Sequence, residues 1–177
     1  MAKGTKQGKW ETFYANGEKE SESTYKGGVL EGPSTSWMMS GEKTSQGNYK
    51  AGKQDGLWTT WHENGQVHTE FTYKAGALDG LSIERFESGQ KQTQATYKAG
   101  KLDGLATEWF ENGQKMSEVT WKAGTPEGLS TSWYDNGQKH TETTLKAGKQ
   151  QGLATEWDAQ GKVTSTVTYL DGKPVAK

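Results

Sequence analysis

The glycines of this chain recur every 24 residues, and this period limits the possible folds more than any other feature. Of the 24 glycines, 22 fall into three series that step by 24 without an insertion. The series run from Gly4 to Gly172, from Gly8 to Gly152 and from Gly17 to Gly161. Only Gly27 and Gly47 lie outside them. A fixed period of this length is typical of repeat proteins, in which one supersecondary unit stacks on the next.

Each repeat contains two alternating segments, for example residues 105–110 and 114–121, joined through Asn112 and Gly113. Alternating segments around a glycine turn indicate a β-hairpin. We therefore predict an all-β fold: an elongated, single-layer antiparallel meander of seven 24-residue β-hairpin repeats in one domain, 1–177. The predicted units are approximately 8–31, 32–55, 56–79, 80–103, 104–127, 128–151 and 152–175.

Two types of hairpin loop compete at Asn112 and Gly113. A two-residue type I′ turn would pair Glu111 with Gln114, whereas a three-residue loop with a bulge at Gly113 would pair Phe110 with Gln114. A slip of one residue exchanges the two faces of a strand. We favour the bulged loop because its register collects the aromatic side chains of both strands on one face.

In that register the aromatic columns share a face that a single-layer sheet leaves open to solvent, and such apolar patches bind partners. One column holds Phe13, Trp37, Trp61, Trp109, Trp133 and Trp157, and the other holds Tyr25, Tyr49, Tyr73, Tyr97, Trp121 and Tyr169. Arg85 replaces the tryptophan in the fourth repeat, where it could stack between rings or meet an acidic partner group. The predicted partner-binding residues are Trp37, Trp61, Arg85, Trp109, Trp133, Trp157, Tyr73, Tyr97 and Trp121.

Charge and composition exclude several classes of function. The net charge is -1, and only one of the 21 basic residues is an arginine, so nucleic acid is not an expected partner. There is no cysteine, which excludes disulfides and thiolate chemistry. No segment has the apolar length of a membrane span or a signal sequence. The chain is cytoplasmic as it stands, or exported if a signal was removed, so its compartment stays undefined.

The histidines are the only candidates for site chemistry outside the periodic pattern. His62 and His68 are predicted to lie diagonally across one hairpin near Glu70, where a weak metal site can be drawn. We interpret them as surface histidines and predict no metal, no cofactor and no catalytic residue, because a periodic surface offers no unique pocket. The recurring Asp-Gly and Glu-Gly steps are interpreted as local turn chemistry. The lysines of the connecting loops are interpreted as a solvated rim, with a polyanion site as the alternative.

Units such as 104–115, with the letters GLATEWFENGQK, resemble the bacterial variant of the MORN repeat. The resemblance extends from about Gly4 to Gly172 and is weakest in the first and last copies. It implies a scaffold, tether or partner-binding module rather than an enzyme, and bacterial proteins of this type are often classed as antitoxins. Two alternatives stay open: a glycan or cell-wall binding array, given a weaker likeness to choline-binding repeats, and a structural, self-assembling protein.

The ends of the array lead to a prediction about assembly. Terminal repeats usually carry a polar cap, and here the only edge protection is charge on the first strand and Pro174 after the last. We therefore predict a homo-oligomer, with face-to-face pairing of the aromatic stripes favoured over end-to-end strand addition. No membrane insertion is expected.

Overall fold

The computed structural model describes residues 5–175, and these form β-strands and turns without a helix. The chain forms two compact units, residues 1–89 and 90–177. The first unit contains β1 (Gly8–Phe13), β2 (Lys19–Lys26), β3 (Val29–Trp37), β4 (Lys43–Lys50), β5 (Lys53–Gln54), β6 (Gly56–Trp61), β7 (Val67–Lys74) and β8 (Ala77–Arg85). The second contains β9 (Lys91–Lys98), β10 (Lys101–Trp109), β11 (Lys115–Lys122), β12 (Thr125–Trp133), β13 (Lys139–Lys146), β14 (Lys149–Trp157), β15 (Val163–Leu170) and β16 (Lys173–Pro174).

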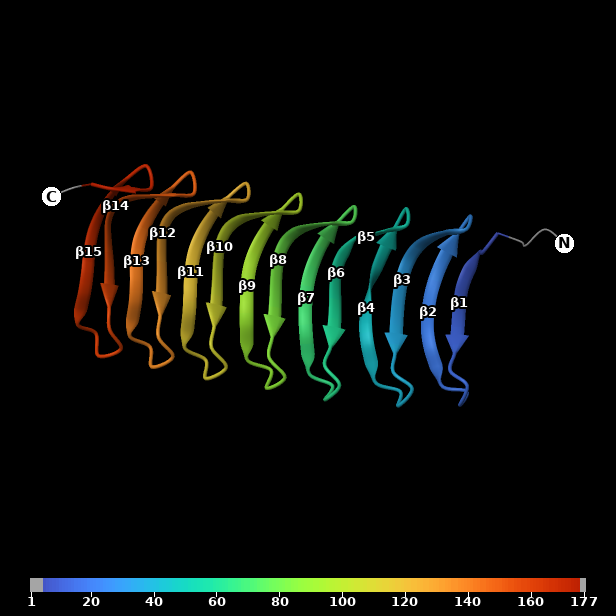
Figure 1. Cartoon of the computed structure of the whole chain (residues 1–177). Coiled ribbons are helices and arrows are strands. Elements are labelled where there is room, and N and C mark those ends of the chain that lie inside the picture. Colours follow the sequence, from blue (N-terminus) through green and yellow to red (C-terminus); the bar gives the residue numbers. More distant parts are fainter. Residues whose placement is uncertain (1–4, 176–177) are drawn as a thin grey trace. The chain divides into compact units, whose positions relative to one another are not determined.

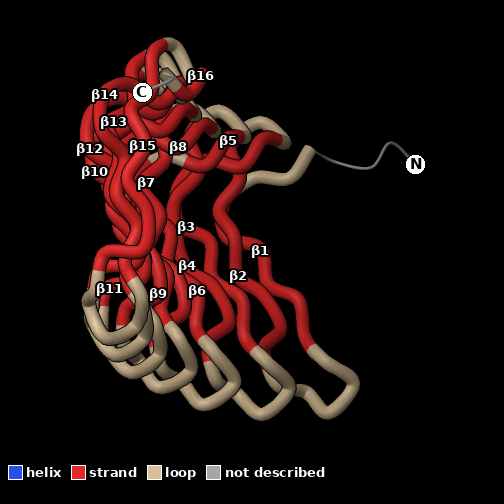
Figure 2. The backbone as a smooth tube through the Cα atoms, turned by 60° about the vertical axis from the view of Figure 1, so that its left-hand side comes forward, coloured by secondary structure: helices blue, strands red, loops and turns tan. Residues whose placement is uncertain are grey.

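Within each unit the strands pair in chain order and in antiparallel fashion, except that the short β5 pairs with β4 alone and β4 also pairs with β6 (Figure 1). The predicted fold class, an all-β antiparallel meander of β-hairpins, is confirmed. The long strands turn sharply near the connecting loops, as Figures 1 and 2 show. Glycine makes this bend accessible: Gly104 in β10 has φ +126°, in the positive-φ region that only glycine visits at low cost.

The described part of the sheet has no conventional hydrophobic core. None of its apolar side chains is fully buried, and its buried polar residues are Thr69, Ser82, Thr107 and Thr131. A single layer has no second sheet or helix to pack against, so side chains cover one another along each face instead.

The chain uses two kinds of tight loop. At the hairpin tips, the Phe110 amide donates to the Gln114 carbonyl at 2.9 Å and the Gly113 amide to the Phe110 carbonyl at 2.9 Å. Gly113 has φ +84°, so this is the predicted three-residue loop with a bulge at glycine, and that prediction is confirmed. The loops between repeats are two-residue turns instead, with positive φ at both positions, for example Ala123 at +51° and Gly124 at +85°.

Five of these connecting turns place alanine in the left-handed region, at residues 51, 75, 99, 123 and 147. The first turn has Gly27 there and the last has Asp171. A Cβ in this region costs roughly 1 kcal/mol, and asparagine bears the conformation better than alanine.

We therefore expect Ala123→Asn to raise the free energy of unfolding by about 0.5–1 kcal/mol. Urea denaturation measures the change. The matched control is Ala15→Asn in an exposed tip, where φ is not positive and no gain is expected. An equal gain from both variants would contradict the explanation by backbone strain.

A second bulge changes which side chains share a face. In the fifth repeat Trp109 pairs with Lys115, but Glu108 pairs with Ser117, so Met116 is an extra residue in β11. Beyond this point Leu105 pairs with Thr120, and Trp121 pairs with Gly104. Cross-strand partners share a face, so Trp121 lies on the opposite face of the sheet from Trp109.

The prediction that both aromatic columns share one face is therefore wrong. The same register shift recurs in the first unit, for example where Trp61 pairs with Val67 but Thr60 pairs with Thr69. We call one side of each unit the tryptophan face; it carries Phe13, Trp37, Trp61 and Arg85 in the first unit and Trp109, Trp133 and Trp157 in the second. The other side is the tyrosine face; it carries Tyr25, Tyr49 and Tyr73 in the first unit and Tyr97, Trp121, Leu145 and Tyr169 in the second.

Candidate functional site

The tryptophan face carries alternating tryptophan and lysine side chains. Lys115, the cross-strand partner of Trp109, reaches over the ring of the next tryptophan, with its Nζ 5.6 Å from the Trp133 ring centroid. The same contact recurs for Lys19 with Trp37 at 5.5 Å, Lys43 with Trp61 at 5.8 Å, Lys91 with Trp109 at 5.7 Å and Lys139 with Trp157 at 5.7 Å. Ammonium groups at this distance are attracted by the ring electrons. Each of these tryptophans therefore has a cation over its ring.

A second contact holds each of these lysines in place. The residue three positions later accepts a hydrogen bond from the amine, because the bulge between them returns the strand to the same face. In three repeats the acceptor is a glutamate: Glu22 at 2.8 Å from Lys19, Glu118 at 2.5 Å from Lys115 and Glu142 at 2.5 Å from Lys139. In two repeats it is a glutamine: Gln46 at 2.8 Å from Lys43 and Gln94 at 2.8 Å from Lys91.

Arg85 breaks the alternation in the first unit. Val67 occupies the lysine position and Arg85 the tryptophan position, so apolar and cationic groups have exchanged places. Glu70, which a lysine would otherwise reach, accepts a hydrogen bond from the Arg85 guanidinium at 3.0 Å. This repeat thus keeps an ion pair between a basic side chain and a glutamate, but it has no tryptophan ring at this position.

A row of exposed leucines follows the tryptophan face nearer the connecting loops. The exposed fractions are 53% for Leu57, 45% for Leu81, 50% for Leu105, 54% for Leu129 and 60% for Leu153. Leu105 lies four residues before Trp109 on β10, so the leucine row lies on the same surface as the ladder of alternating tryptophan and lysine side chains. Apolar side chains at regular spacing on one open surface are typical of a site for another molecule.

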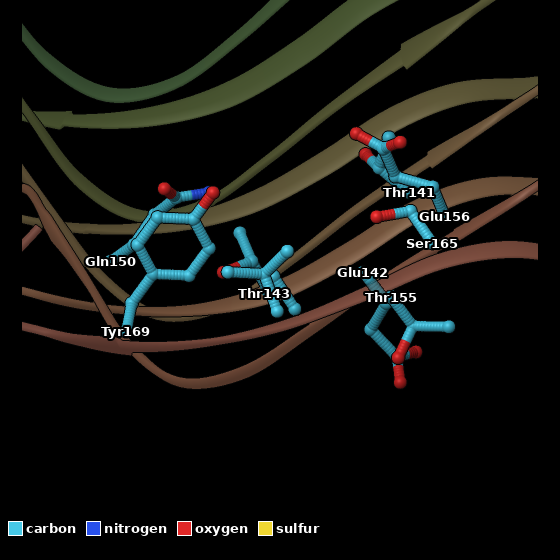
Figure 3. A pocket seen from close by; sticks show the side chains of 10 residues that line it. Thr141, Glu142, Thr143, Gln150, Thr155, Glu156, Ser165 and Tyr169 are labelled. Carbon is cyan, nitrogen blue, oxygen red and sulfur yellow. The ribbon is translucent and has the colours of Figure 1, made fainter. Parts of the chain in front are cut away.

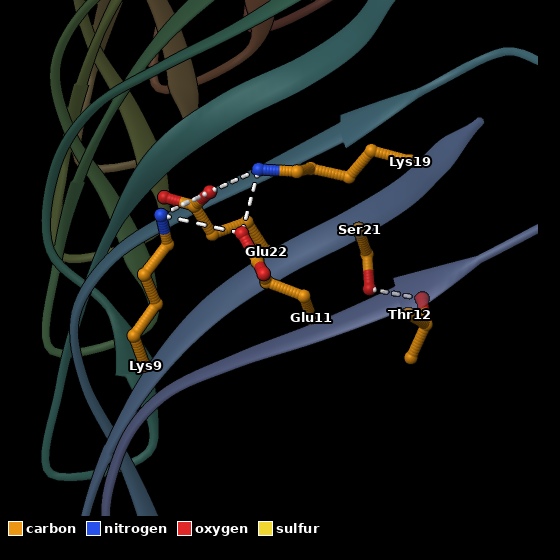
Figure 4. A network of polar contacts seen from close by, with 6 residues as sticks. All are labelled: Lys9, Glu11, Thr12, Lys19, Ser21 and Glu22. Atoms are coloured by element: carbon orange, nitrogen blue, oxygen red, sulfur yellow. Dashed lines mark hydrogen bonds and ion pairs between the residues drawn. The ribbon is translucent and has the colours of Figure 1, made fainter. Parts of the chain in front are cut away.

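Four charged side chains of the first hairpin form a network on the tryptophan face (Figure 4). Lys9 contacts Glu22 at 2.7 Å and Glu11 at 3.3 Å, and Lys19 contacts Glu11 at 2.6 Å and Glu22 at 2.8 Å. Hydrogen bonds from Lys19 and Lys9 lower the pKa of Glu22 from 4.5 to about 2. Lys9 and Glu11, two of the charges predicted to protect the first strand, are thus neutralised within the hairpin.

This pKa shift gives a stability that depends on pH. The carboxyl group of Glu22 binds protons more weakly in the folded chain, so its contribution is complete above pH 4.5 and is lost as the pH falls towards 2. We expect Glu22→Gln to lower the thermal midpoint at neutral pH and to match the wild type near pH 2. Thermal unfolding followed by circular dichroism at a series of pH values measures this. A difference that persists unchanged at the acidic end would contradict the role of the Glu22 charge.

The tyrosine face is packed differently. Of the predicted partner-binding residues, Tyr73, Tyr97 and Trp121 lie here, half-buried and separated from the tryptophans. Burial raises the pKa of the Tyr73 hydroxyl. The indole Nε1 of Trp121 is buried without a hydrogen-bond partner. The sequence missed Trp58, which lies against Tyr49 with ring centroids 5.3 Å apart and fills the space above Gly47.

A pocket on the tyrosine face of β13, β14 and β15 is lined mainly by polar side chains (Figure 3). Gln150 and Tyr169 lie at one end, and Thr141, Glu156 and Ser165 at the other. The hydroxyl oxygen of Thr143 between them is buried without a hydrogen-bond partner. The lining combines uncharged groups with a single carboxylate on this face, so it has no pair of groups for acid-base chemistry.

Two sets of polar residues join successive repeats. One set is formed by acidic residues of the Asp-Gly and Glu-Gly steps. The carboxylate of such a residue accepts a hydrogen bond from the backbone amide of the positive-φ residue in the next connecting turn. Asp103 accepts from the Ala123 amide at 3.0 Å, and Glu127 accepts from the Ala147 amide at 2.8 Å. Glycine in these steps has positive φ as predicted, for example +126° at Gly104, but the prediction that the acidic side chain bonds its own backbone is wrong for Asp103, whose carboxylate acts 20 residues away. At the tips, the side-chain Nδ2 of Asn112 donates to the backbone carbonyl of Asp135 in the next repeat at 2.6 Å.

The histidines join these structural contacts. The His62 ring nitrogen Nε2 lies 2.9 Å from the carbonyl oxygen of Arg85, where Tyr14 and Tyr134 make the equivalent bond in their repeats. His68 lies against the His62 ring at 4.2 Å. Glu70 lies on the opposite face with Arg85, so these three side chains do not converge. Within residues 5–175 no group of three potential metal ligands comes together.

The repeated hairpins and their inter-repeat bonds define the class: a β-hairpin repeat module. The family model described as the MORN repeat variant matches residues 6–26, 54–75, 78–99, 102–123 and 126–147, more than half of the chain. The chain belongs to this family, whose repeats in general form non-catalytic scaffolds. No curated protein matches the sequence. None of the described residues forms a helix long and apolar enough to cross a membrane.

Proposed function

We propose that this protein is a non-catalytic interaction module whose tryptophan face binds a protein partner. The observation that carries the proposal is the row of leucines, 45–60% exposed, beside the tryptophan and lysine ladder. Apolar side chains between charged groups suit a protein interface, whose centre is apolar and whose rim is polar. An antitoxin role would be a special case, in which the bound protein is a toxin that the module neutralises.

The lysines over the tryptophan rings favour a protein over a glycan. A sugar stacks on the flat face of an aromatic ring, and that face must be free. Here an ammonium group lies 5.5–5.8 Å from the ring centroid of five tryptophans. A sugar would have to displace a cation that is also hydrogen-bonded to a neighbouring side chain, so the glycan alternative is disfavoured.

The proposal also holds that the chain has no catalytic centre. Catalysis needs a set of convergent groups, at least one of them activated by its surroundings. Each lysine over a tryptophan ring hydrogen-bonds to the side chain three residues later, a glutamate in three repeats and a glutamine in two, so none of these positions gathers the convergent groups of a catalytic centre. Arg85 is the exception in sequence, and its guanidinium is already paired with Glu70.

Site-specific photo-crosslinking tests which surface meets the partner. A photoreactive phenylalanine analogue replaces Leu57 or Leu129 on the tryptophan face, and Glu63 or Glu111 at the tips as matched controls. In cells that express the protein, we expect a protein adduct from the two leucine positions and none from the tips. Adducts that form only at the tips, or at no position, would contradict the proposed face.

Self-association through the same face is the second candidate, because the leucine row would be covered equally well by a second copy. Light scattering over a hundredfold range of concentration would then show a dimer that Leu129→Glu dissociates, whereas Glu111→Gln would leave it intact. A constant monomer mass would contradict this second candidate and leave the first standing.

A further inference from the structure

The charges of the tryptophan face cancel within most repeats, but two lysines have no acidic partner. Lys19, Lys115 and Lys139 each pair with a glutamate on this face, and Arg85 pairs with Glu70. Lys43 and Lys91 hydrogen-bond to glutamine and make no ion pair among the described residues. The face therefore carries a net positive charge at two positions, one in each unit.

The Lys43 position combines a cation with apolar surface. Its ammonium group lies 5.8 Å from the centroid of Trp61 and 2.8 Å from the Gln46 side-chain oxygen. Trp61 is the last residue of β6, and Leu57, 53% exposed, lies on the same face of that strand. Lysine and glutamine are both exposed, so a group from outside can reach the amine.

The Lys91 position in the second unit has the same construction. Its amine lies 5.7 Å from the centroid of Trp109 and 2.8 Å from the Gln94 side-chain oxygen, and Leu105 on β10 is 50% exposed. A neutral amide oxygen holds the ammonium group in place without cancelling its charge. A carboxylate from a partner would add an ion pair that the repeats with glutamate already make internally.

We propose that the partner presents acidic segments: a carboxylate pairs with Lys43 while an apolar side chain contacts Leu57 in the first unit, and a carboxylate likewise pairs with Lys91 beside Leu105 in the second. This inference rests on the proposed function and specifies the chemistry of the partner. Complementary charge at an interface increases the association rate and selects among partners. The two cations thus determine which proteins the otherwise neutral face accepts.

A protein segment fits these two positions better than a nucleic acid does. Nucleic acids need a continuous set of cations, rich in arginine, along the phosphate backbone. Each unit has a single free cation of this kind on the tryptophan face among the described residues, and basic groups such as Arg85 are neutralised by a carboxylate. The adjoining leucines also offer apolar contact, which a phosphate backbone cannot use.

Charge variants built from the protein's own repeats test the proposal. Gln46→Glu and Gln94→Glu copy the lysine and glutamate pair of residues 115 and 118, so the fold should be retained. Glu118→Gln does the reverse and creates a third free cation. The probe is a fluorescein-labelled, glutamate-rich peptide with interspersed leucines, and the same peptide with glutamine in place of glutamate is its control. Fluorescence anisotropy gives the affinity, and circular dichroism checks the fold.

We expect the wild type to bind the acidic peptide and not its glutamine control, more weakly as salt is added. The double variant Gln46→Glu/Gln94→Glu should bind on the order of tenfold more weakly, and Glu118→Gln a few-fold more tightly. No binding by the wild type, or equal affinity for all variants, would overturn the proposal. Equally tight binding of inorganic polyphosphate with the same dependence on the variants would overturn the protein segment as the ligand. Crosslinking at Leu57 and Leu129 is independent of these outcomes, so the proposed function can survive failure here.

Discussion

Replacing Gly47 by valine is expected to lower the free energy of unfolding by about 3 kcal/mol, near the upper end of overpacking effects. A Cβ at this position would lie 2.0 Å from the Cε3 atom of Trp58, far inside any van der Waals contact. The indole has little freedom to withdraw, because Tyr49 packs against it edge-on at 5.3 Å and Phe71 is its cross-strand partner. The added side chain must therefore displace a ring or the backbone.

A second substitution tests this explanation. The double variant Gly47→Val/Trp58→Ala would place valine across from alanine, a combination that the protein already has within one hairpin at Val119 and Ala106. We expect it to recover most of the loss, with a coupling energy of about 2 kcal/mol by chemical denaturation. Ala95→Val is the matched control, since its partner in β10 is Ala106 and no indole lies across from it. A double variant no more stable than Gly47→Val would show that the loss comes from glycine's backbone rather than from the indole.

Replacing Asn136 by alanine is expected to cost about 2 kcal/mol, roughly 1 kcal/mol for each of two hydrogen bonds. The Asn136 Nδ2 donates to the carbonyl of Ala159 in the next repeat at 2.8 Å, and its Oδ1 accepts from the Gln138 amide at 2.9 Å. The side chain thus stabilises its own loop and joins it to the following one.

Aspartate separates these two contributions. Asn136→Asp keeps the acceptor for Gln138 but loses the donor to Ala159, so it isolates the bond between repeats. If that bond matters, Asn136→Asp should be nearly as unstable as Asn136→Ala, both in thermal unfolding and in amide hydrogen exchange at the last repeat. If the aspartate variant matches the wild type, the asparagine acts only within its own loop. In the last repeat Gln160 holds the asparagine position, and Asp158, two residues earlier, bonds to the Gln160 and Lys162 amides of its own tip.

The sequence predicted the features that depend on residues close together in the chain. The glycine period indicated β-hairpins, and the loop at Asn112 and Gly113 was predicted correctly because turn type depends on a few adjacent residues. The candidate surface was predicted in part. The tryptophan column and Arg85 lie on one face of their units, whereas Tyr73, Tyr97 and Trp121 lie on the other.

Tertiary structure alone decided which residues meet across strands and repeats. One extra residue at Met116 separates the aromatic columns, and alternation cannot reveal it because a bulge is visible only against the partner strand. The role of Gly47 and the role of Asp103 likewise depend on distant residues. The Trp58 ring occupies the space beside Gly47, and the Asp103 carboxylate accepts a hydrogen bond from the Ala123 amide. Such partners lie 11 to 20 residues apart and become neighbours only when the strands pair. The period of this chain is a local property and can be counted in its letters, whereas the faces of its sheet follow from strand register, which is fixed only by the folded hairpins.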